Sequence, residues 1–443
     1  MTGNDRGRVQ QPVRHNRPGM ASTSSNPARE ATRTRLLRDF CPFFSTIRLV
    51  NFRCSPIRKS YIPLAGALVA CMAVVVPMAP QVASALPTAS SATKAELLVP
   101  ATQKVAGGAP EIDWPGAGRA RLEVAGLGTI GRKSSSTTQV PIASVTKVMT
   151  AYTILKDHPL SASAKGPTIR ITKKDVKIYK QLKADGASVL KVKKGVNLTQ
   201  RQLLQGLLLE SGSNMAVTLA RWDVGSQAKF VAKMNKNAKA LGMTNTTFVD
   251  VHGVNKKSSS STEDLLDLAP AAMKSAAFRK IVRTKNAKIP LHSLTNTNKL
   301  LGANKVIGIK TGTTSPAGAC LLFAATDKVN GKTYTIYGAL LGVKGNKAAK
   351  AKRFPYAKAM VKTAQAELRS VNLLKKGTAL VTMTTADGSV RKYGVKKTLT
   401  GPAWDGLAYK LSLPSGLAKG ETPTKIIVKQ GSHTYSPALA RLS

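Results

Sequence analysis

The sequence predicts a mixed α/β protein of the α+β type, with a large region over residues 111–371 and a small all-β domain over residues 372–443. Three observations predict this division. Helical periodicity recurs between residues 144 and 284. Apolar strand-like segments flank Asn330-Gly331, a dipeptide typical of hairpin turns. After residue 372 the helical period is lost, and short β segments alternate with turn residues.

The N-terminal residues predict export. Residues 1–59 are basic and are predicted to form a disordered tail, unless Met20 is the true first residue. Residues 60–85 contain an apolar run that ends in small residues, which is typical of a signal peptide. A retained membrane anchor is the alternative, and either one places the rest of the chain outside the cytoplasm. Residues 86–110 are rich in small and polar residues and are predicted to be a linker.

The elements of the large region follow in chain order. Strands are expected between residues 119 and 140, then a helix from about Ser144 and Lys-rich mixed structure over 165–197. Thr199 and Gln202 resemble a capping box ahead of a helix. The further expected helices cover residues 200–210, the segment from after Ser213 to Trp222, residues 226–241 and residues 261–284. A strand over 305–312, the hairpin strands and a helix over 352–371 complete the region.

The charge of the chain points to an anionic partner. Lys and Arg number 68 against 21 acidic residues, a formal net charge of +47. Such a protein is attracted to polyanions. The sequence has no zinc-finger spacing, RNP-type strand or basic zipper, so we expect no nucleic-acid partner.

Cysteine and histidine indicate neither a disulfide framework nor a metal site. After removal of residues 1–85 only Cys320 remains, and the five His residues lack ligand spacing. His252 is the only His in a suggestive setting, but no nucleophile-elbow motif accompanies it. We interpret His252 as a structural loop residue and expect no metal and no cofactor.

Ser144 and Lys147 form the first candidate reactive pair. Residues i and i+3 share a helix face, so a neutral Lys amine can take the proton of the Ser hydroxyl. Burial and nearby cations favour that neutral form. The pattern also occurs at Ser91–Lys94 and Ser226–Lys229, but only Ser144 lies where a β segment ends and an amphipathic helix begins.

Two further polar motifs follow in the chain. Ser211-Gly212-Ser213-Asn214 lies between two apolar helices, where it can enter a cleft or simply cap both helices. Lys310-Thr311-Gly312-Thr313 directly follows an apolar strand. Lys and Thr at a strand edge suit a carboxylate, and Gly permits close approach of a substrate backbone. An ordinary polar strand end is the alternative.

Together, these motifs resemble the penicillin-recognising serine enzymes, and most closely the low-molecular-mass D-alanyl-D-alanine carboxypeptidases. The resemblance runs from about Trp114 to Val371 and includes PIASVTKVMTAY, LGMTNTTFVDVHG, STEDLLDLA and GIKTGTTSPAGACLLFAA. It implies a β-lactamase/transpeptidase-like fold, with an antiparallel sheet flanked by helices and an all-helical lobe. It also implies a peptidoglycan substrate and covalent inhibition by β-lactams. The positive charge, and not the resemblance, makes anionic cell-wall polymers or a membrane surface the further expected partners.

The same resemblance implies roles for these residues. Ser144 is the nucleophile, Lys147 its base, and Ser211 the relay for the proton to the leaving D-alanine. Lys310, Thr311 and Gly312 hold the terminal carboxylate, and Thr313 shares the oxyanion hole with Ser144. One departure is that the family usually has Ser-x-Asn in the second motif. Here either Ser213 replaces that Asn, or Asn214 reaches in from a shifted loop.

Two other functions remain as alternatives. A serine β-lactamase would need a carboxylate that activates water, and Glu263-x-x-Leu266-Asp267 superficially resembles such a motif. A non-catalytic cell-wall binding protein would explain the altered second motif, although the intact set of Ser144, Lys147 and Lys310 opposes it.

Overall fold

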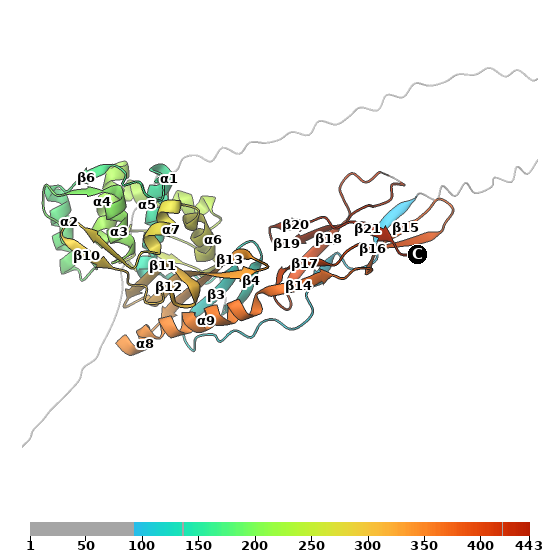
Figure 1. Cartoon of the computed structure of the whole chain (residues 1–443). Helices are drawn as coiled ribbons and strands as arrows, with labels where there is room; N and C mark the ends of the chain where they lie inside the picture. Colours follow the sequence, from blue (N-terminus) through green and yellow to red (C-terminus); the bar gives the residue numbers. More distant parts are fainter. Residues whose placement is uncertain (1–92, 135–136, 419) are drawn as a thin grey trace, which may run out of the picture. The chain divides into compact units, whose positions relative to one another are not determined.

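The computed structural model describes residues 93–134, 137–418 and 420–443 (Figure 1). The predicted basic tail, the predicted signal segment and the first part of the predicted linker lie outside these residues. Within the described ranges, no helix combines the length and the apolar character that a membrane crossing requires.

A five-stranded antiparallel sheet occupies the middle of the large region, with strand order β11-β12-β13-β3-β4. The strands are β3 (Arg119–Val124), β4 (Gly128–Lys133), β11 (Val306–Thr314), β12 (Gly318–Val329) and β13 (Lys332–Val343). The expected hairpin joins β12 to β13, where Val329 pairs with Lys332. Both turn residues have positive φ, Asn330 at 49° and Gly331 at 76°, as the two-residue hairpin requires.

Helices cover both faces of this sheet. Alternate residues of β12 face opposite sides, so that Leu322 joins one hydrophobic cluster and Phe323 the other. The first cluster includes the helical lobe, and the second includes α9. The helices are α1 (Thr146–Asp157), α2 (Lys173–Ala184), α3 (Gln200–Leu208), α4 (Ser213–Val224), α5 (Gln227–Ala240), α6 (Thr262–Met273), α7 (Ala276–Val282), α8 (Lys347–Ala351) and α9 (Arg353–Glu367).

Side-chain caps set several helix starts. The Thr199 hydroxyl accepts a hydrogen bond from the Gln202 backbone N–H, and the Thr199 backbone N–H donates to the Gln202 side chain, which confirms the predicted capping box of α3. Ser275 caps α7 by accepting a hydrogen bond from the backbone N–H of Phe278. The expectation of helix throughout 261–284 was therefore wrong at Ser275, where one helix ends and the next begins. The helix expected over 352–371 is also shorter, because residues 369–374 form a strand.

Three short two-stranded sheets frame the helical lobe. The first is formed by β5 (Val140–Pro141) and β8 (Ser259–Ser260), and the second by β6 (Thr168–Arg170) and β7 (Asn197–Thr199). The third is formed by β9 (Asn286–Ile289) and β10 (His292–Thr295). The β5–β8 pair brings the residues just before the first motif beside the segment that precedes α6.

The C-terminal residues contribute β15-β16-β21 to one four-stranded sheet and β18-β19-β20 to a second, and they form the pair β14-β17. Their strands are β14 (Arg369–Leu374), β15 (Ala379–Thr384), β16 (Val390–Val395), β17 (Leu399–Ala403), β18 (Ala408–Ser412), β19 (Ile427–Gln430), β20 (His433–Tyr435) and β21 (Leu439–Arg441).

The two remaining strands correct the predicted linker. β1 (Lys94–Leu97) and β2 (Thr102–Lys104) lie within residues 86–110 and pair with β15 and β18. Both are short, half-exposed edge strands, so neither carries an apolar run that sequence periodicity can detect. The β-rich region thus draws strands from both sides of the large region.

A glycine in β13 tests the packing of the sheet. An added Cβ at Gly338 would lie 2.0 Å from Cζ of the buried Phe323 ring. We expect Gly338→Ala to lower the free energy of unfolding by about 1–3 kcal/mol through overpacking. Urea unfolding measures this, with Gly108→Ala as control, because a Cβ there has no atom within 4 Å. Equal stability of the two variants would contradict the packing.

Candidate active site

Ser144 and Lys147 meet at the start of α1. Ser144 lies on the short 3-10 turn η1 (Ala143–Val145), two residues before α1 begins, and its side chain is half-buried. The Lys147 Nζ atom lies 2.8 Å from Ser144 Oγ and 2.7 Å from the His252 carbonyl oxygen. These contacts hold the amine directly against the hydroxyl, as the i, i+3 spacing predicted.

The surroundings of Lys147 favour its neutral form. The side chain is fully buried. Burial, with a further contribution from the charge of Lys310, lowers the pKa of Lys147 well below its usual range, and the charge of Asp250 opposes this only in part. A neutral amine can donate one hydrogen to the His252 carbonyl and still offer its lone pair to the Ser144 hydroxyl.

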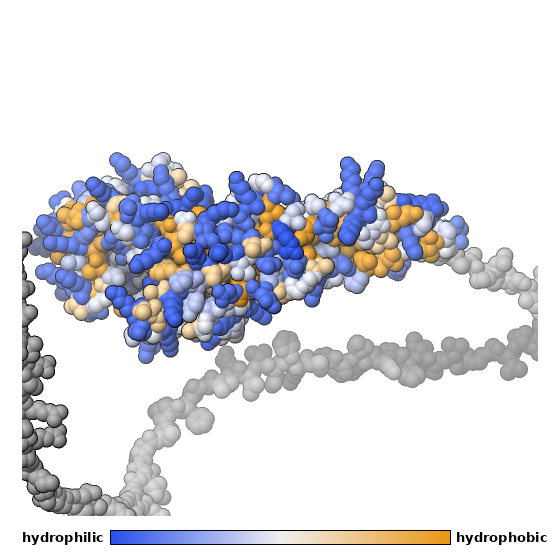
Figure 2. Space-filling model, turned by 60° about the horizontal axis from the view of Figure 1, so that its bottom comes forward, coloured by the Kyte–Doolittle hydropathy of each residue, from blue (hydrophilic) through white to orange (hydrophobic). Residues whose placement is uncertain are grey.

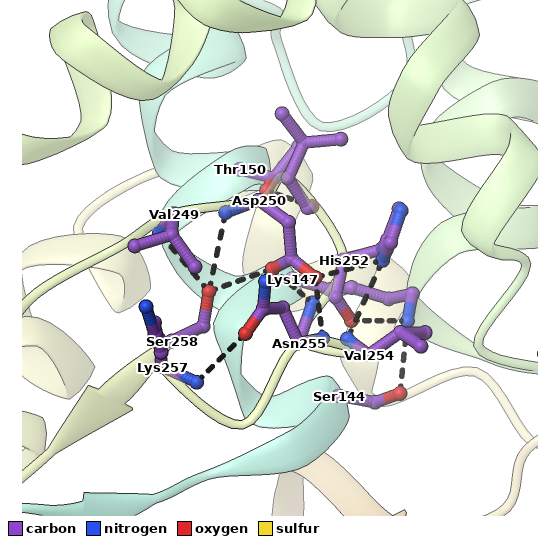
Figure 3. A network of polar contacts seen from close by, with 12 residues as sticks. Ser144, Lys147, Thr150, Val249, Asp250, His252, Val254, Asn255, Lys257 and Ser258 are labelled. Atoms are coloured by element: carbon purple, nitrogen blue, oxygen red, sulfur yellow. Dashed lines mark hydrogen bonds and ion pairs between the residues drawn. The ribbon is translucent and has the colours of Figure 1, made fainter.

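The loop over residues 249–258 lies beside Lys147 and contacts it through the His252 carbonyl (Figure 3). Asp250 accepts hydrogen bonds from the backbone of Gly253 (2.7 Å) and Asn255 (2.8 Å) and from Ser258 Oγ (2.7 Å). Its carboxylate also lies 3.2 Å from His252 Nδ1. Burial would raise the pKa of Asp250, but the hydrogen bond and charge of His252, with the hydrogen bonds from Asn255 and Ser258, hold it below its ordinary value.

Ser211 lies in the turn between α3 and α4. Its φ is +68°, an uncommon conformation for a residue other than Gly. Its Oγ is buried and has no hydrogen-bond partner within the described part of the chain. A buried hydroxyl without a partner is costly, and a strained residue is often functional. Both features suit a hydroxyl that forms its hydrogen bond only when a substrate is bound.

Asn214 has partners other than a substrate. Its Oδ1 accepts from the Leu190 N–H at 3.0 Å, and its Nδ2 donates to the Leu190 carbonyl at 2.8 Å. The neighbouring Ser213 N–H donates to the Ser188 carbonyl at 2.8 Å. The sequence left open whether Asn214 reaches into the site. The observed geometry opposes this, because the amide already holds the 186–192 segment, and Ser213 remains at the position of the usual Asn.

Strand β11, which carries the third motif, lies next to the turn that carries Ser144. Lys310 is buried, and burial followed by the charge of Arg353 lowers its pKa to about 7. The Thr311 hydroxyl lies 2.7 Å from the Thr297 hydroxyl. A Cβ at Gly312 would lie 3.0 Å from the Ser144 nitrogen, so the absence of a side chain lets the strand approach the turn that carries Ser144. The third motif therefore faces the first.

Two components of the site escaped sequence reasoning. Arg353, at the start of α9, donates to the Thr313 hydroxyl at 2.5 Å and to the Gly312 carbonyl at 3.1 Å. No local motif marks it within a Lys-rich segment. His252, interpreted from the sequence as structural, contacts Lys147 through its backbone carbonyl, while its ring contacts Asp250. The VDVHGVN setting was the available signal.

Other candidate groups lie elsewhere. Glu263, considered as a base for a β-lactamase, forms an ion pair with Arg121 of β3 at 3.1 Å. Across the described ranges, no cluster of three or more His, Cys, Asp or Glu side chains is arranged to hold a metal ion. The assembled groups can therefore activate a hydroxyl and bind an anion.

Comparison with known proteins finds similarity to one family of enzymes. A model of the D-alanyl-D-alanine carboxypeptidase family, peptidase family S11, matches residues 127–336. A D-alanyl-D-alanine carboxypeptidase from Streptomyces sp. (strain K15) is 36% identical over 219 residues, or 45% of this chain and 73% of that protein. Two D-alanyl-D-alanine carboxypeptidases of Escherichia coli (strain K12), DacC and DacA, also match, and in each case the match spans 47% of the relative's own length.

Solved structures agree with the predicted fold. The crystal structure of the Streptomyces K15 DD-transpeptidase has a TM-score of 0.51 and 30% identity, and the match covers 58% of this chain and 100% of that one. The D-alanyl-D-alanine carboxypeptidase DacD from Francisella tularensis is 19% identical, with a TM-score of 0.56, over 75% of this chain and 94% of that one. The likeness to DacD shows the fold alone. The predicted fold class is confirmed.

Gly253 tests the contact between the 249–258 loop and the turn that carries Ser144. Its φ is +78°, and a Cβ there would lie 1.8 Å from the Ala143 carbonyl oxygen. We expect Gly253→Ala to displace the His252 carbonyl from Lys147 and to slow acylation by a penicillin at least tenfold. Gly242→Ala is the control, because its φ is +79° and its Cβ meets no atom within 4 Å. Acylation slowed equally in both variants would refute the proposed contact.

Proposed function

The chain belongs to the D-alanyl-D-alanine carboxypeptidase family, and we propose that it removes the terminal D-alanine from peptidoglycan stem peptides through an acyl-enzyme on Ser144. The observation that carries this proposal is the fully buried amine of Lys147, held 2.8 Å from the Ser144 hydroxyl. Residues 111–371 would form the catalytic domain, and residues 372–443, with β1 and β2, an accessory domain.

Acylation begins with proton transfer. Neutral Lys147 takes the hydroxyl proton of Ser144, and the Ser144 oxygen attacks the carbonyl carbon of the peptide bond between the two D-alanines. The negative charge that develops on the carbonyl oxygen is met by the backbone N–H groups of Ser144 and Thr313. Fixed donors of this kind contribute much of the rate in acyl transfer, because they need no reorganisation during the reaction.

Departure of D-alanine requires a proton on its amine. Ser211 is suited to pass it from the Lys147 ammonium, since its buried hydroxyl has no competing partner within the described part of the chain. Water then hydrolyses the acyl-enzyme, or an amine acceptor resolves it by transpeptidation. The relatives named above include both a carboxypeptidase and a transpeptidase, and we propose hydrolysis as the principal outcome.

The terminal carboxylate of the substrate would bind at β11. Lys310 and Thr311 supply a cation and a hydroxyl, and Gly312 leaves room for the substrate backbone. Arg353 adds a second cation at the same edge, close to Thr313. A carboxylate between these cations raises the affinity of Lys310 for its proton and so keeps it charged. A β-lactam carboxylate would use the same contacts.

Ser213 distinguishes this site from the usual motif. A hydroxyl is shorter than a carboxamide and offers one donor where the amide offers two. We propose that Ser213 contacts the substrate amide less extensively than an Asn would, and that Asn214 serves to position the loop.

The protein would act outside the cytoplasm. The apolar segment over residues 60–85, read as a signal peptide, supports secretion, and the alternative is a retained anchor. The net charge of +47 supports attraction to anionic cell-wall polymers or to the membrane surface.

Covalent labelling tests the proposed activity. We expect the wild-type protein to bind a fluorescent penicillin as a stable adduct and to release D-alanine from a pentapeptide ending in D-Ala-D-Ala. Ser144→Ala should lose both activities while keeping its unfolding temperature. No labelling of the wild type would favour the non-catalytic alternative, and rapid turnover of the penicillin would favour a β-lactamase.

The pH dependence of acylation tests the role of Lys147. Because the base is the neutral amine, acidification through its lowered pKa should slow acylation, by about tenfold per pH unit below that pKa. Stopped-flow measurement of penicillin acylation gives the profile. Lys147→Met, which keeps the apolar stem without a base, should be inactive at every pH. A rate independent of pH between about 5 and 9 would refute the assignment of Lys147 as the base.

A further inference from the structure

A dense group of cations covers one side of the helical lobe. It consists of exposed residues on β6, on α2 and on the segment that follows α2. We call it the α2 basic surface, and its members are Arg170, Lys173, Lys174, Lys177, Lys180, Lys183, Lys191, Lys193 and Lys194. None of these side chains forms an ion pair with a described acidic residue, so their charges are open to a ligand.

The acidic residues in this stretch do not neutralise it. Asp175 is buried and is held by Arg221 at 2.7 Å, while it also caps α2 through Thr172. Asp185 accepts a hydrogen bond from Gln181. The α2 basic surface therefore keeps a local excess of positive charge, in addition to the general excess of the chain.

The helix geometry aligns these charges. Lys173, Lys177 and Lys180 follow the i, i+4, i+7 spacing of a single helix face. Val176 and Tyr179 are half-buried and pack against the core of the lobe. In Figure 1, α2 lies at the outer edge of the helical lobe. Its three aligned lysines are exposed. The arrangement suits an extended chain that carries repeated negative charges.

The same surface leads to the active site. Lys191, Lys193 and Lys194 follow the segment whose backbone holds the second motif, through Ser188 to Ser213 and through Leu190 to Asn214. A ligand bound along α2 and this segment would end close to the substrate. Much of the face drawn in Figure 2 is hydrophilic, as expected for a protein of this charge.

The chemistry of the surface selects among polyanions. Eight of its nine cations are Lys, which acts as a point charge and does not impose bidentate geometry. A membrane-bound amphipathic helix needs an exposed apolar face, but the apolar side of α2 is packed inside the protein. A nucleic acid would call for an aromatic side chain on which its bases can stack. Tyr179 of α2 packs against the same core and does not offer such a surface.

From these observations we propose that the α2 basic surface binds a flexible cell-wall polymer that carries repeated phosphate groups. Binding there would hold the active site close to the stem peptides of a wall that carries this polymer. The effective concentration of those peptides at the active site would therefore rise. The inference deepens the proposed function, on which it rests only for the location at the wall, since the binding itself requires no catalysis.

A matched pair of variants tests the proposal in the full-length protein. One replaces Lys173, Lys174, Lys177, Lys180 and Lys183 by Gln. The control replaces five exposed lysines of the C-terminal strands and turns by Gln, namely Lys375, Lys376, Lys396, Lys397 and Lys410. Each variant loses five positive charges, so the two have equal net charge. Unfolding temperature and penicillin labelling check that both are folded.

Binding is measured by the fluorescence anisotropy of a labelled poly(glycerol phosphate) chain between 50 and 200 mM salt (about the range over which phosphate contacts are lost). We expect the α2 variant to bind at least tenfold more weakly and its salt slope to fall by up to about 3.5, or about 0.7 for each lost contact. The control should change by less than twofold. Equal weakening of both variants, or no change in the α2 variant, would overturn the proposal.

Two further measurements separate this proposal from its rivals. Phosphatidylglycerol vesicles that bind more tightly than the polymer, with the same dependence on the α2 lysines, would overturn it in favour of a membrane surface. Ser144→Ala should bind the polymer as the wild type does. If penicillin labelling fails while α2-dependent binding persists, the proposed catalysis is wrong and the polymer site stands. The α2 variant should release D-alanine normally from a soluble pentapeptide but more slowly from polymer-bearing wall.

Discussion

The site depends on the burial of one amine. Lys147 is placed in the protein interior with only a hydroxyl and a backbone carbonyl for partners, and a charged ammonium is costly there. Around it, the protein supplies a second buried cation, Lys310, and a compensating carboxylate, Asp250. The balance of these charges keeps the amine able to accept a proton. The fold serves to bring all three groups within reach from separate parts of the chain.

Close approach between segments achieves this. β11 lies against the turn that carries Ser144 because Gly312 has no side chain, and the 249–258 loop reaches the same turn because of Gly253. Each contact is made through the backbone, where a side chain would obstruct it. The turn between α3 and α4 holds Ser211 at a positive φ, with its hydroxyl unpartnered within the described residues. The turn that carries Ser144 is thus contacted by the backbone of two distant segments.

Local signals made much of this predictable from the sequence. Thr199 and Gln202 predicted the start of α3, and Asn330-Gly331 predicted the hairpin, because caps and turns depend on residues that are close in the sequence. The break at Ser275 and the edge strands β1 and β2 were missed, because tertiary pairing decides them. The same holds within the site. The three motifs were recognisable from their order, whereas the Arg353 contact and the Leu190 partner of Asn214 depend on how distant segments pack.

The position of β1 and β2 bears on how this protein reaches its folded state. Their partners, β15 and β18, are synthesised only after the whole catalytic region, so the two sheets cannot close until the chain is nearly complete. Pairings of such sequence separation are slow to form, because the intervening chain must first be ordered. We therefore expect the β-rich region to assemble last and to unite both ends of the described chain, so that loss of either end would leave unpaired strand edges on the other.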